Sequence, residues 1–310
     1  MGYVNQRTAF GETLVEIGRK NEKLVVLDAD LGGSTMGKLF EIAYPNRHFE
    51  MGIAEANMLS VSAGLAQTGK IPVANSFAVF VAGRAFDQIR QTIAIGKLNV
   101  KIGGSSAGLS DFGDGATHQS VDDIAIMSAI PNMTVICPAD ANEMVEATKA
   151  MIEYEGPVYI RINRNDYENS TPVGKPFVIG EPSVIKEGKD IVLFATGYMV
   201  GLATKAAEAV ANDISVKVVN ISTIKPLNAD KIIELVGDAK AVITAEEHSV
   251  IGGLGAAIAS ALCKSCKPIE MIGIQDTFGC SGHNYPELLE HFNLTEEAVV
   301  EAIKKVNILG

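Results

Sequence analysis

Several features are scarce in this chain of 310 residues, and each scarcity excludes a class of protein. No apolar run approaches the ~18 residues that span a bilayer, so we expect no membrane protein. Basic residues number 26 against 37 acidic ones, a net charge of −11, and no Lys/Arg run forms the basic stripe that nucleic acids require. The start, MGYVNQ, matches neither a secretion signal nor a myristoylation signal, which predicts a cytoplasmic protein.

Cysteine is also scarce, with four residues at Cys137, Cys263, Cys266 and Cys280. They are too few and too scattered for the disulfide framework of a small secreted domain. Cys263 and Cys266 form a CxxC pair, but no second pair stands at zinc-site spacing, and the motif closes an apolar helical stretch instead of opening a helix. We therefore expect these to be buried or half-buried thiols without a redox or zinc role.

The chain does contain a repeated alternation of short apolar runs and amphipathic stretches, which predicts strands and helices in turn. A first series of apolar runs lies at 24–28, 71–75, 100–104, 134–138 and 157–161, and a second at 190–197, 216–222, 240–247 and 269–276. A segment rich in Pro, Gly, Asn and Ser separates the two series. The pattern predicts an α/β fold of two doubly wound domains with mostly parallel sheets. The expected boundaries are a first domain over 1–165, a linker over 166–183 and a second domain over 184–310.

One candidate site lies where a strand is followed by a helix. The stretch HFEMGIAEANM runs from a short strand through Gly52 into a helix and puts Glu55 in the first helical turn. A carboxylate there stabilises the positive helix end, and it also stands at the carboxyl edge of the sheet, where α/β domains bind ligands. Phe77 and Phe80, three residues apart after the strand at 71–75, are expected in the core or in the same crevice.

A second candidate is the segment 103–123, which is polar, Gly-rich and longer than a minimal strand-to-helix connection. These properties favour a binding loop. It carries Asp114 and, four residues later, His118, whose imidazole can act as acid, base or hydrogen-bond partner near neutral pH. The GDG at 113–115 with Asn142 downstream imitates a magnesium and diphosphate motif, but such a site directly follows a buried strand, and this GDG lies deep in a polar loop. We therefore assign no metal ligand to this chain.

Three residues suit a phosphate group: Arg7 near the start of the first helix, Ser34 in a Gly-rich turn after the first strand, and Arg164 after the strand at 157–161. Arginine binds phosphate through two parallel hydrogen bonds, and a Gly-rich turn offers backbone N–H groups. Taken singly, each is equally typical of a surface residue.

Taken together, a series of motifs resembles the C-terminal half of transketolase, in the family's order and over essentially the whole chain. The motifs are ADLGGS, FEMGIAEANM, SFAVF, GDGATHQ, PNMTVICPAD, INR and the ending DTFGCSGHNYPELLEHFNLTEEAVVEAIKKV. The resemblance implies a pyrimidine-binding domain followed by a transketolase C-terminal domain, in agreement with the two domains that the pattern predicts. It also implies the second chain of a transketolase that is split into two chains.

The resemblance further implies thiamine diphosphate as cofactor. Glu55 matches the catalytic carboxylate that contacts N1′ of the aminopyrimidine, a hydrogen bond that favours the imino tautomer. Phe77 and Phe80 match the aromatic residues that pack against the pyrimidine ring, and Asp30 matches an acidic residue close to the cofactor. All four are therefore expected to bind the cofactor.

On the substrate side, the resemblance implies transfer of a two-carbon ketol unit from a ketose phosphate to an aldose phosphate, a reaction of the pentose phosphate pathway. Asp114 and His118 match residues that hydrogen-bond the sugar, and His118 is also expected to be catalytic. Arg7, Ser34 and Arg164 match the residues that hold the substrate phosphate.

The chain also departs from full-length transketolases. A tyrosine expected to stack with the two phenylalanines is replaced near Gly83, and a substrate-binding histidine is replaced by Gly104 or Ser105. The run RAFDQI at 84–89 resembles 1-deoxyxylulose-5-phosphate synthase and the β subunit of 2-oxoacid dehydrogenases, so pyruvate is an alternative donor. A catalytically idle regulatory subunit is a further alternative, against which the presence of Glu55 and His118 argues.

Because no metal and diphosphate motif remains in this chain, the resemblance implies that a partner holds both groups. The expected partner is an N-terminal transketolase subunit that binds the diphosphate through Mg²⁺ or Ca²⁺. We expect this chain to associate with itself and with that partner as an α₂β₂ heterotetramer, and to be inactive alone.

Overall fold

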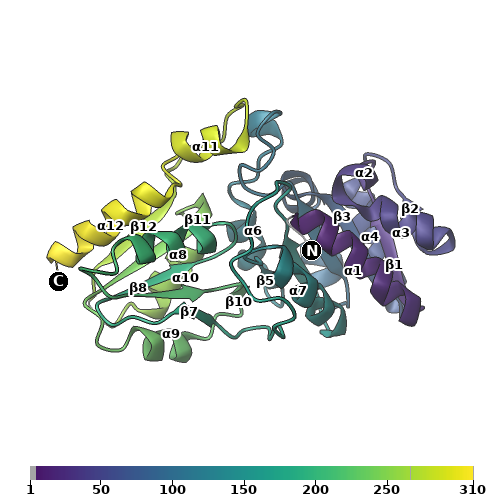
Figure 1. Cartoon of the computed structure of the whole chain (residues 1–310). Coiled ribbons are helices and arrows are strands. Elements are labelled where there is room, and N and C mark those ends of the chain that lie inside the picture. The colour runs from purple at the N-terminus through teal and green to yellow at the C-terminus, as the bar shows by residue number, and fades with distance from the viewer. Residues whose placement is uncertain (1–4, 266, 310) are drawn as a thin grey trace.

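The computed structural model describes residues 5–265 and 267–309, which form two β-sheets flanked by helices (Figure 1). In these residues the first sheet has seven strands in the order β10-β5-β6-β4-β3-β1-β2. Its strands run parallel except β10, which pairs antiparallel with β5. The strands are β1 (Leu24–Asp28), β2 (His48–Glu50), β3 (Ile71–Phe77), β4 (Lys101–Ser105), β5 (Thr134–Ile136), β6 (Val158–Arg161) and β10 (Thr223–Lys225).

The second sheet of the described residues has five strands in the order β12-β11-β8-β9-β7. It is parallel except at β7, which pairs antiparallel with β9. The strands are β7 (Ser183–Lys186), β8 (Ile191–Ala195), β9 (Val216–Asn220), β11 (Ala241–Ser249) and β12 (Ile269–Ile274). The prediction of an α/β fold with two mostly parallel, doubly wound sheets is thus confirmed.

Helices cover both faces of the first sheet. On one face α1 packs against α3 and α7, and Phe10 and Leu14 of α1 share a core with Val73 of β3 and Met144 of α7. On the other face α4 packs on β3. The helical segments of this half are α1 (Gln6–Lys20), α2 (Gly32–Thr35), α3 (Gly37–Ala43), η1 (Pro45–Arg47), α4 (Glu55–Gln67), η2 (Phe80–Arg84), α5 (Phe86–Gln88), η3 (Ile89–Ala94), η4 (Gly115–Thr117), α6 (Asp123–Ala129) and α7 (Ala141–Glu153).

The second sheet is likewise enclosed, with α8 and α12 packed against each other over one face and α9 and α10 adjacent on the other. The helices are α8 (Met199–Ala209), α9 (Ala229–Val236), α10 (Leu254–Ala261), α11 (Tyr285–His291) and α12 (Glu296–Leu309). Because both faces are covered, the central strands are continuously buried, which explains their unbroken apolar runs in the sequence. Among the described residues, no helix combines the length and apolar character needed to cross a membrane.

The two halves share one hydrophobic core, in which Ile102 of β4 and Phe194 of β8 belong to the same cluster. They are also joined by β10, which lies within the segment expected as the second domain yet pairs with β5 of the first sheet. The strands β7 and β10 were not expected from the sequence. Both are short antiparallel edge strands, too brief or too exposed to produce an apolar run.

The cysteine prediction is wrong for one residue, because Cys263 is exposed. It follows α10 at the end of the apolar helix, where the chain turns outward. Cys137 is buried and Cys280 is half-buried, while Cys266 lies outside the described residues.

Candidate active site

Glu55 opens α4 at the carboxyl edge of the first sheet. The chain leaves β2, turns at Gly52 with φ +67°, and enters the helix at Glu55, in the first helical turn that the sequence indicated. The side chain is only 1% exposed. Its two carboxylate oxygens accept hydrogen bonds of 2.8 and 2.7 Å from Nη1 of Arg84. A buried carboxylate therefore sits beside the positive end of a helix and one guanidinium group.

An aromatic cluster lies next to this carboxylate. Phe77 ends β3 and Phe80 begins the π-helical segment η2, and their rings stack at 5.9 Å with an interplanar angle of 12°. The wider π-helical turn ends at Arg84, whose guanidinium lies 4.8 Å from the centroid of the Phe80 ring. The His118 ring meets both phenylalanines edge-on, at 6.1 and 5.3 Å. The structure thus brings Glu55, Phe77, Phe80 and His118 together.

His118 reaches the cluster from the long loop between β4 and α6. The short segment η4 precedes it, and Thr117 Oγ1 lies 3.0 Å from His118 Nδ1. Asp114 stands at the start of the same turn and is exposed. Asn142, the other half of the magnesium-like motif, donates instead to the backbone oxygen of Thr171 at 2.8 Å. Within the described part of the chain, no group of three or more His, Cys, Asp or Glu side chains has the arrangement of a metal site.

The three phosphate candidates also come together. Arg7 Nη1 donates to the backbone oxygen of Ser34 at 3.2 Å, and Arg7 and Arg164 line one pocket of about 430 Å³. Burial lowers the pKa of Arg7, and the positive charge of Arg164 lowers it further. The buried Nε atom of Arg7 has no hydrogen-bond partner among the described residues. The carboxylates of Asp166 and Asp111 act in the opposite direction on this pKa, so the unpartnered Nε is the feature that suits the pocket to an anion.

Asp30 has no hydrogen bond to either of these two groups among the described residues. It follows β1 with φ 60°, its side chain is exposed, and its backbone N–H donates to Glu50 Oε1 at 2.7 Å. The buried acidic residue at the end of β1 is Asp28, which lies 2.9 Å from Nε2 of His48 and accepts a 2.6 Å hydrogen bond from Thr35. The exposed side chain of Asp30 thus lies at the carboxyl edge of the first sheet, directly after β1.

Two functional candidates escaped the sequence analysis. Arg84 was noted only as part of a resembling run, although its spacing of four residues from Phe80 was a signal that both side chains share one helix face. Asp111 gave no signal, because only the folded loop puts its carboxylate 2.5 Å from Nη1 of Arg164. This contact links the loop that carries His118 to the Arg7–Arg164 pocket.

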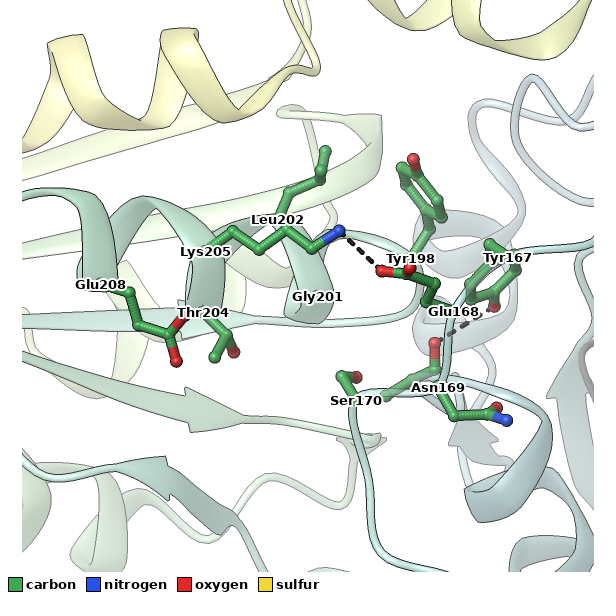
Figure 2. Close-up of a pocket in the computed structure, with 11 residues that line it drawn as sticks. Tyr167, Glu168, Asn169, Ser170, Tyr198, Gly201, Leu202, Thr204, Lys205 and Glu208 are labelled. Carbon is green, nitrogen blue, oxygen red and sulfur yellow. Dashed lines mark hydrogen bonds and ion pairs between the residues drawn. The ribbon is translucent and has the colours of Figure 1, made fainter. Parts of the chain in front are cut away.

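A separate pocket of about 410 Å³ lies between the segment after β6 and α8 (Figure 2). Figure 2 shows Lys205 directed toward Glu168 across it, and the two side chains form an ion pair of 2.8 Å. Tyr167 donates a hydrogen bond to the backbone oxygen of Ala139 at 3.1 Å. Tyr167 and Tyr198 belong to both this pocket and the Arg7–Arg164 pocket. None of the candidate site residues lines it, so we keep it outside the active site.

The fold and the clustered side chains define a two-domain α/β chain with a candidate ligand site at the carboxyl edge of its first sheet. Two family models match it: the transketolase pyrimidine-binding domain over residues 3–170 and the transketolase C-terminal domain over residues 180–299. The chain belongs to the transketolase family and corresponds to its C-terminal half, which confirms the resemblance found in the motifs.

Individual relatives agree. The chain is 44% identical over 308 residues to a transketolase C-terminal section from Methanocaldococcus jannaschii, covering 97% of this chain and 96% of that protein. It is 39% identical over 302 residues to a 6-deoxy-6-sulfo-D-fructose transketolase subunit from Clostridium sp. strain MSTE9, covering 97% and 94%. A solved split-gene transketolase, described as an inactive β4 tetramer, is 44% identical with a TM-score of 0.90 over 99% of both chains.

The chain is also similar to a longer enzyme. It is 35% identical over 303 residues to the 1-deoxy-D-xylulose-5-phosphate synthase of Chlorobium luteolum, covering 96% of this chain and 47% of that protein. The chain thus spans about half the length of this relative.

Proposed function

We propose that this chain is the C-terminal subunit of a thiamine-diphosphate-dependent transketolase. It transfers a two-carbon ketol unit from a ketose phosphate to an aldose phosphate. The observation that carries the proposal is the buried carboxylate of Glu55 beside the stacked rings of Phe77 and Phe80.

The residues present fit the aminopyrimidine of the cofactor. A flat, weakly polar ring packs well on a phenylalanine face, and the Glu55 carboxylate accepts a hydrogen bond from a protonated ring nitrogen at its edge. When bound, thiamine diphosphate would supply a nucleophilic carbon and a cationic ring that can accept electron density from the ketol unit. Glu55 then holds the proton at the pyrimidine N1′, and the low exposure of its carboxylate keeps water from competing for that contact. Asp30, at the same carboxyl edge of the sheet, is also assigned to cofactor binding.

We place the substrate between the cluster around Glu55 and His118 and the pocket lined by Arg7 and Arg164. His118 and Asp114 orient the sugar by hydrogen bonds to its hydroxyl groups, and His118 also exchanges a proton with the reacting oxygen near the aromatic cluster. Arg7, Arg164 and the Gly-rich turn at Ser34 bind the phosphate. The Asp111–Arg164 contact couples the phosphate end to the loop that carries His118.

A partner chain completes this assignment. We assign the diphosphate and its Mg²⁺ or Ca²⁺ to an N-terminal transketolase subunit, and the assembly to an α₂β₂ heterotetramer. The support comes from the relatives, which include a transketolase C-terminal section and a split-gene transketolase described as an inactive β4 tetramer.

A second candidate function uses pyruvate as donor, with release of CO₂. The run 84–89 and the likeness to a 1-deoxy-D-xylulose-5-phosphate synthase favour it. We favour a ketose phosphate over pyruvate as donor because both subunit-sized relatives described above carry transketolase names.

The test is a titration of this chain with thiamine diphosphate and Mg²⁺, with and without the N-terminal subunit, while ketol transfer from xylulose 5-phosphate to ribose 5-phosphate is followed. We expect transfer only with both chains present, and its loss in Glu55→Gln. Glu41→Gln is the matched control, since Glu41 pairs with Lys38 on the surface of α3.

Transfer by this chain alone would overturn the partner requirement. CO₂ release from pyruvate without ketol transfer would replace the proposal with the synthase-like function.

A further inference from the structure

The loop that carries His118 is closed at its base and held from outside. At the base, Gly108 N donates to the backbone oxygen of Ser120 at 2.9 Å. Farther along the loop, Gly282 N donates to the backbone oxygen of Phe112 at 2.8 Å, and beside the base Gln119 Nε2 donates to that of Cys280 at 2.9 Å. The holding segment precedes α11 and belongs to the C-terminal half of the chain (Figure 1).

Gly115 shows how closely these segments fit. It has φ +75°, and a Cβ atom there would lie 2.4 Å from Oγ of Ser281, which is closer than any side chain tolerates. The backbone of the loop therefore rests directly on the segment before α11, three residues away from His118.

A buried carboxylate of the C-terminal half holds the beginning of the same loop. Glu247, in β11, is 3% exposed, and its Oε1 accepts a 2.7 Å hydrogen bond from Leu109 N. Its Oε2 accepts a 2.7 Å hydrogen bond from the hydroxyl of Tyr285. Gly108 permits the approach, since it has φ +62° and a Cβ atom there would lie 2.4 Å from Oε1. The carboxylate thus ties the loop to α11.

Burial raises the pKa of Glu247, and the charge of Arg161 and the hydrogen bonds from Tyr285 and Leu109 oppose that shift. Both carboxylate oxygens accept hydrogen bonds, so Glu247→Gln, which replaces one oxygen by an NH₂ group, leaves a buried donor on one side without its acceptor. The end of the loop is fixed by the same strand, because Ser249 N donates to Val121 O at 2.7 Å and Arg161 Nη2 bridges the backbone oxygens of Ser120 and Glu247.

We propose that Glu247 is a positioning residue, through which the C-terminal domain fixes the loop that carries His118 and hence the position of the His118 side chain. The inference rests on the proposed function only for the role of His118. The hydrogen bonds between Glu247 and the loop are a property of this chain, and their effect on the loop can be measured without an activity assay.

The neighbouring glutamate provides a matched control. Glu246 is also fully buried, but its carboxylate accepts hydrogen bonds from Leu254 N and Gly255 N, at 2.7 and 2.8 Å, and so caps α10. Glu246→Gln and Glu247→Gln are the same chemical change at adjacent buried positions of one strand. Only Glu247 contacts the loop.

The first measurement is amide hydrogen exchange on the whole chain. We expect Glu247→Gln to speed exchange across residues 109–119 at least tenfold, and Glu246→Gln to change those residues less than twofold while speeding exchange in α10. Unchanged exchange at 109–119 in Glu247→Gln, or an equal increase in both variants, would overturn the proposal. Should Glu247→Gln not fold, Tyr285→Phe removes the hydrogen bond that joins the Glu247 carboxylate to α11, and faster exchange at 109–119 is then the expected result.

The second measurement uses the chain assembled with its N-terminal subunit. For Glu247→Gln we expect kcat/KM for the sugar phosphate to fall about tenfold, while the Kd of thiamine diphosphate stays within twofold, because Glu55 and the two phenylalanines lie outside the loop. Equal losses of cofactor binding and of kcat/KM would mark a general structural role and contradict positioning. Failure of the proposed function is a different result, since the wild-type pair would then lack ketol transfer while the exchange difference persists.

Discussion

Arg84 lies on Glu55 and covers the carboxylate that the proposed function needs. One nitrogen, Nη1, bonds both carboxylate oxygens, at 2.8 and 2.7 Å, and the same guanidinium lies over the ring of Phe80. Glu55 is buried, whereas the Arg84 side chain is 49% exposed. The arginine therefore competes with the aminopyrimidine for the Glu55 oxygens and for one face of the Phe80 ring.

From this contact we expect Arg84→Gln to tighten binding of thiamine diphosphate by the assembled enzyme. An ion pair with one half-exposed member contributes about 1 kcal/mol or less, so the Kd is expected to fall by up to about fivefold. Isothermal titration of wild-type and variant assemblies measures the change.

Arg90→Gln is the control for this substitution, because Arg90 is an exposed arginine in the following turn and its loss changes the net charge equally. Weaker binding in Arg84→Gln would mean that Arg84 supports the bound cofactor instead of blocking it.

Much of the fold could be predicted from the sequence because covered parallel strands are continuously apolar. The runs at 24–28 and 190–197 coincide with β1 and β8 for this reason. The edge strand β10 could not be predicted, since three residues carry no periodicity and the pairing with β5 depends on how the two halves pack.

Those residues of the candidate site that lie at or directly after the end of a strand could be predicted from the sequence. Glu55 and Phe77 lie at the same edge of the first sheet because parallel strands share one carboxyl edge. The contacts of Arg84, Asp111 and Glu247 depend on the path of a loop or a π-helical turn, which local sequence does not determine. Glu247 lies 138 residues from its partner Leu109.

Packing restricts the side chain at Gly104, one of the two positions, with Ser105, where the resemblance implied a substrate-binding histidine. A Cβ atom on Gly104 would lie 2.1 Å from the hydroxyl oxygen of Tyr159, a fully buried side chain that donates to Asp123 at 2.7 Å. We expect Gly104→Ala to lower the free energy of unfolding by about 1–3 kcal/mol, as overpacking does.

Urea denaturation measures this change. In Gly64→Ala, the control within α4, the new methyl group meets nothing within 4 Å, so the same substitution is expected to be neutral or to stabilise by up to about 1 kcal/mol. Equal stability of the two variants would show that the Tyr159 side chain can move away, and that position 104 accommodates a side chain.

Arg7 provides a test of the phosphate pocket. Its buried Nε has no hydrogen-bond partner among the described residues, and a bound anion would supply one. Hydrogen bonds to charged groups contribute about 1.5–3 kcal/mol, so we expect Arg7→Gln to lower kcat/KM for a phosphorylated aldose about 10- to 100-fold.

The measurement compares a phosphorylated acceptor with its unphosphorylated sugar, for which less than a threefold change is expected. Arg19→Gln, at the exposed end of the same helix, controls for net charge. Equal losses for both acceptors would place the phosphate elsewhere.

Lys101 gives a prediction about pH that is independent of catalysis. Its side chain is fully buried, Nζ donates to the backbone oxygens of Tyr154 and Gly156 at 2.6 and 2.8 Å, and burial lowers the pKa from 10.5 to about 7. Between these two pH values the unfolded chain binds more protons than the folded one at this site. The contribution of Lys101 to stability therefore rises with pH from about 7 to 10.5, with a slope of up to about 1.4 kcal/mol per pH unit.

Lys101→Met removes this titration, so the free energy of unfolding of the variant relative to wild type should fall steadily as pH rises through that window. Denaturant unfolding at pH 7, 8 and 9 follows the difference, with Lys304→Met on the exposed face of α12 as control. A difference that stays constant over this range would mean that Lys101 keeps its charge when folded, because the two carbonyl oxygens then compensate for the lost hydration.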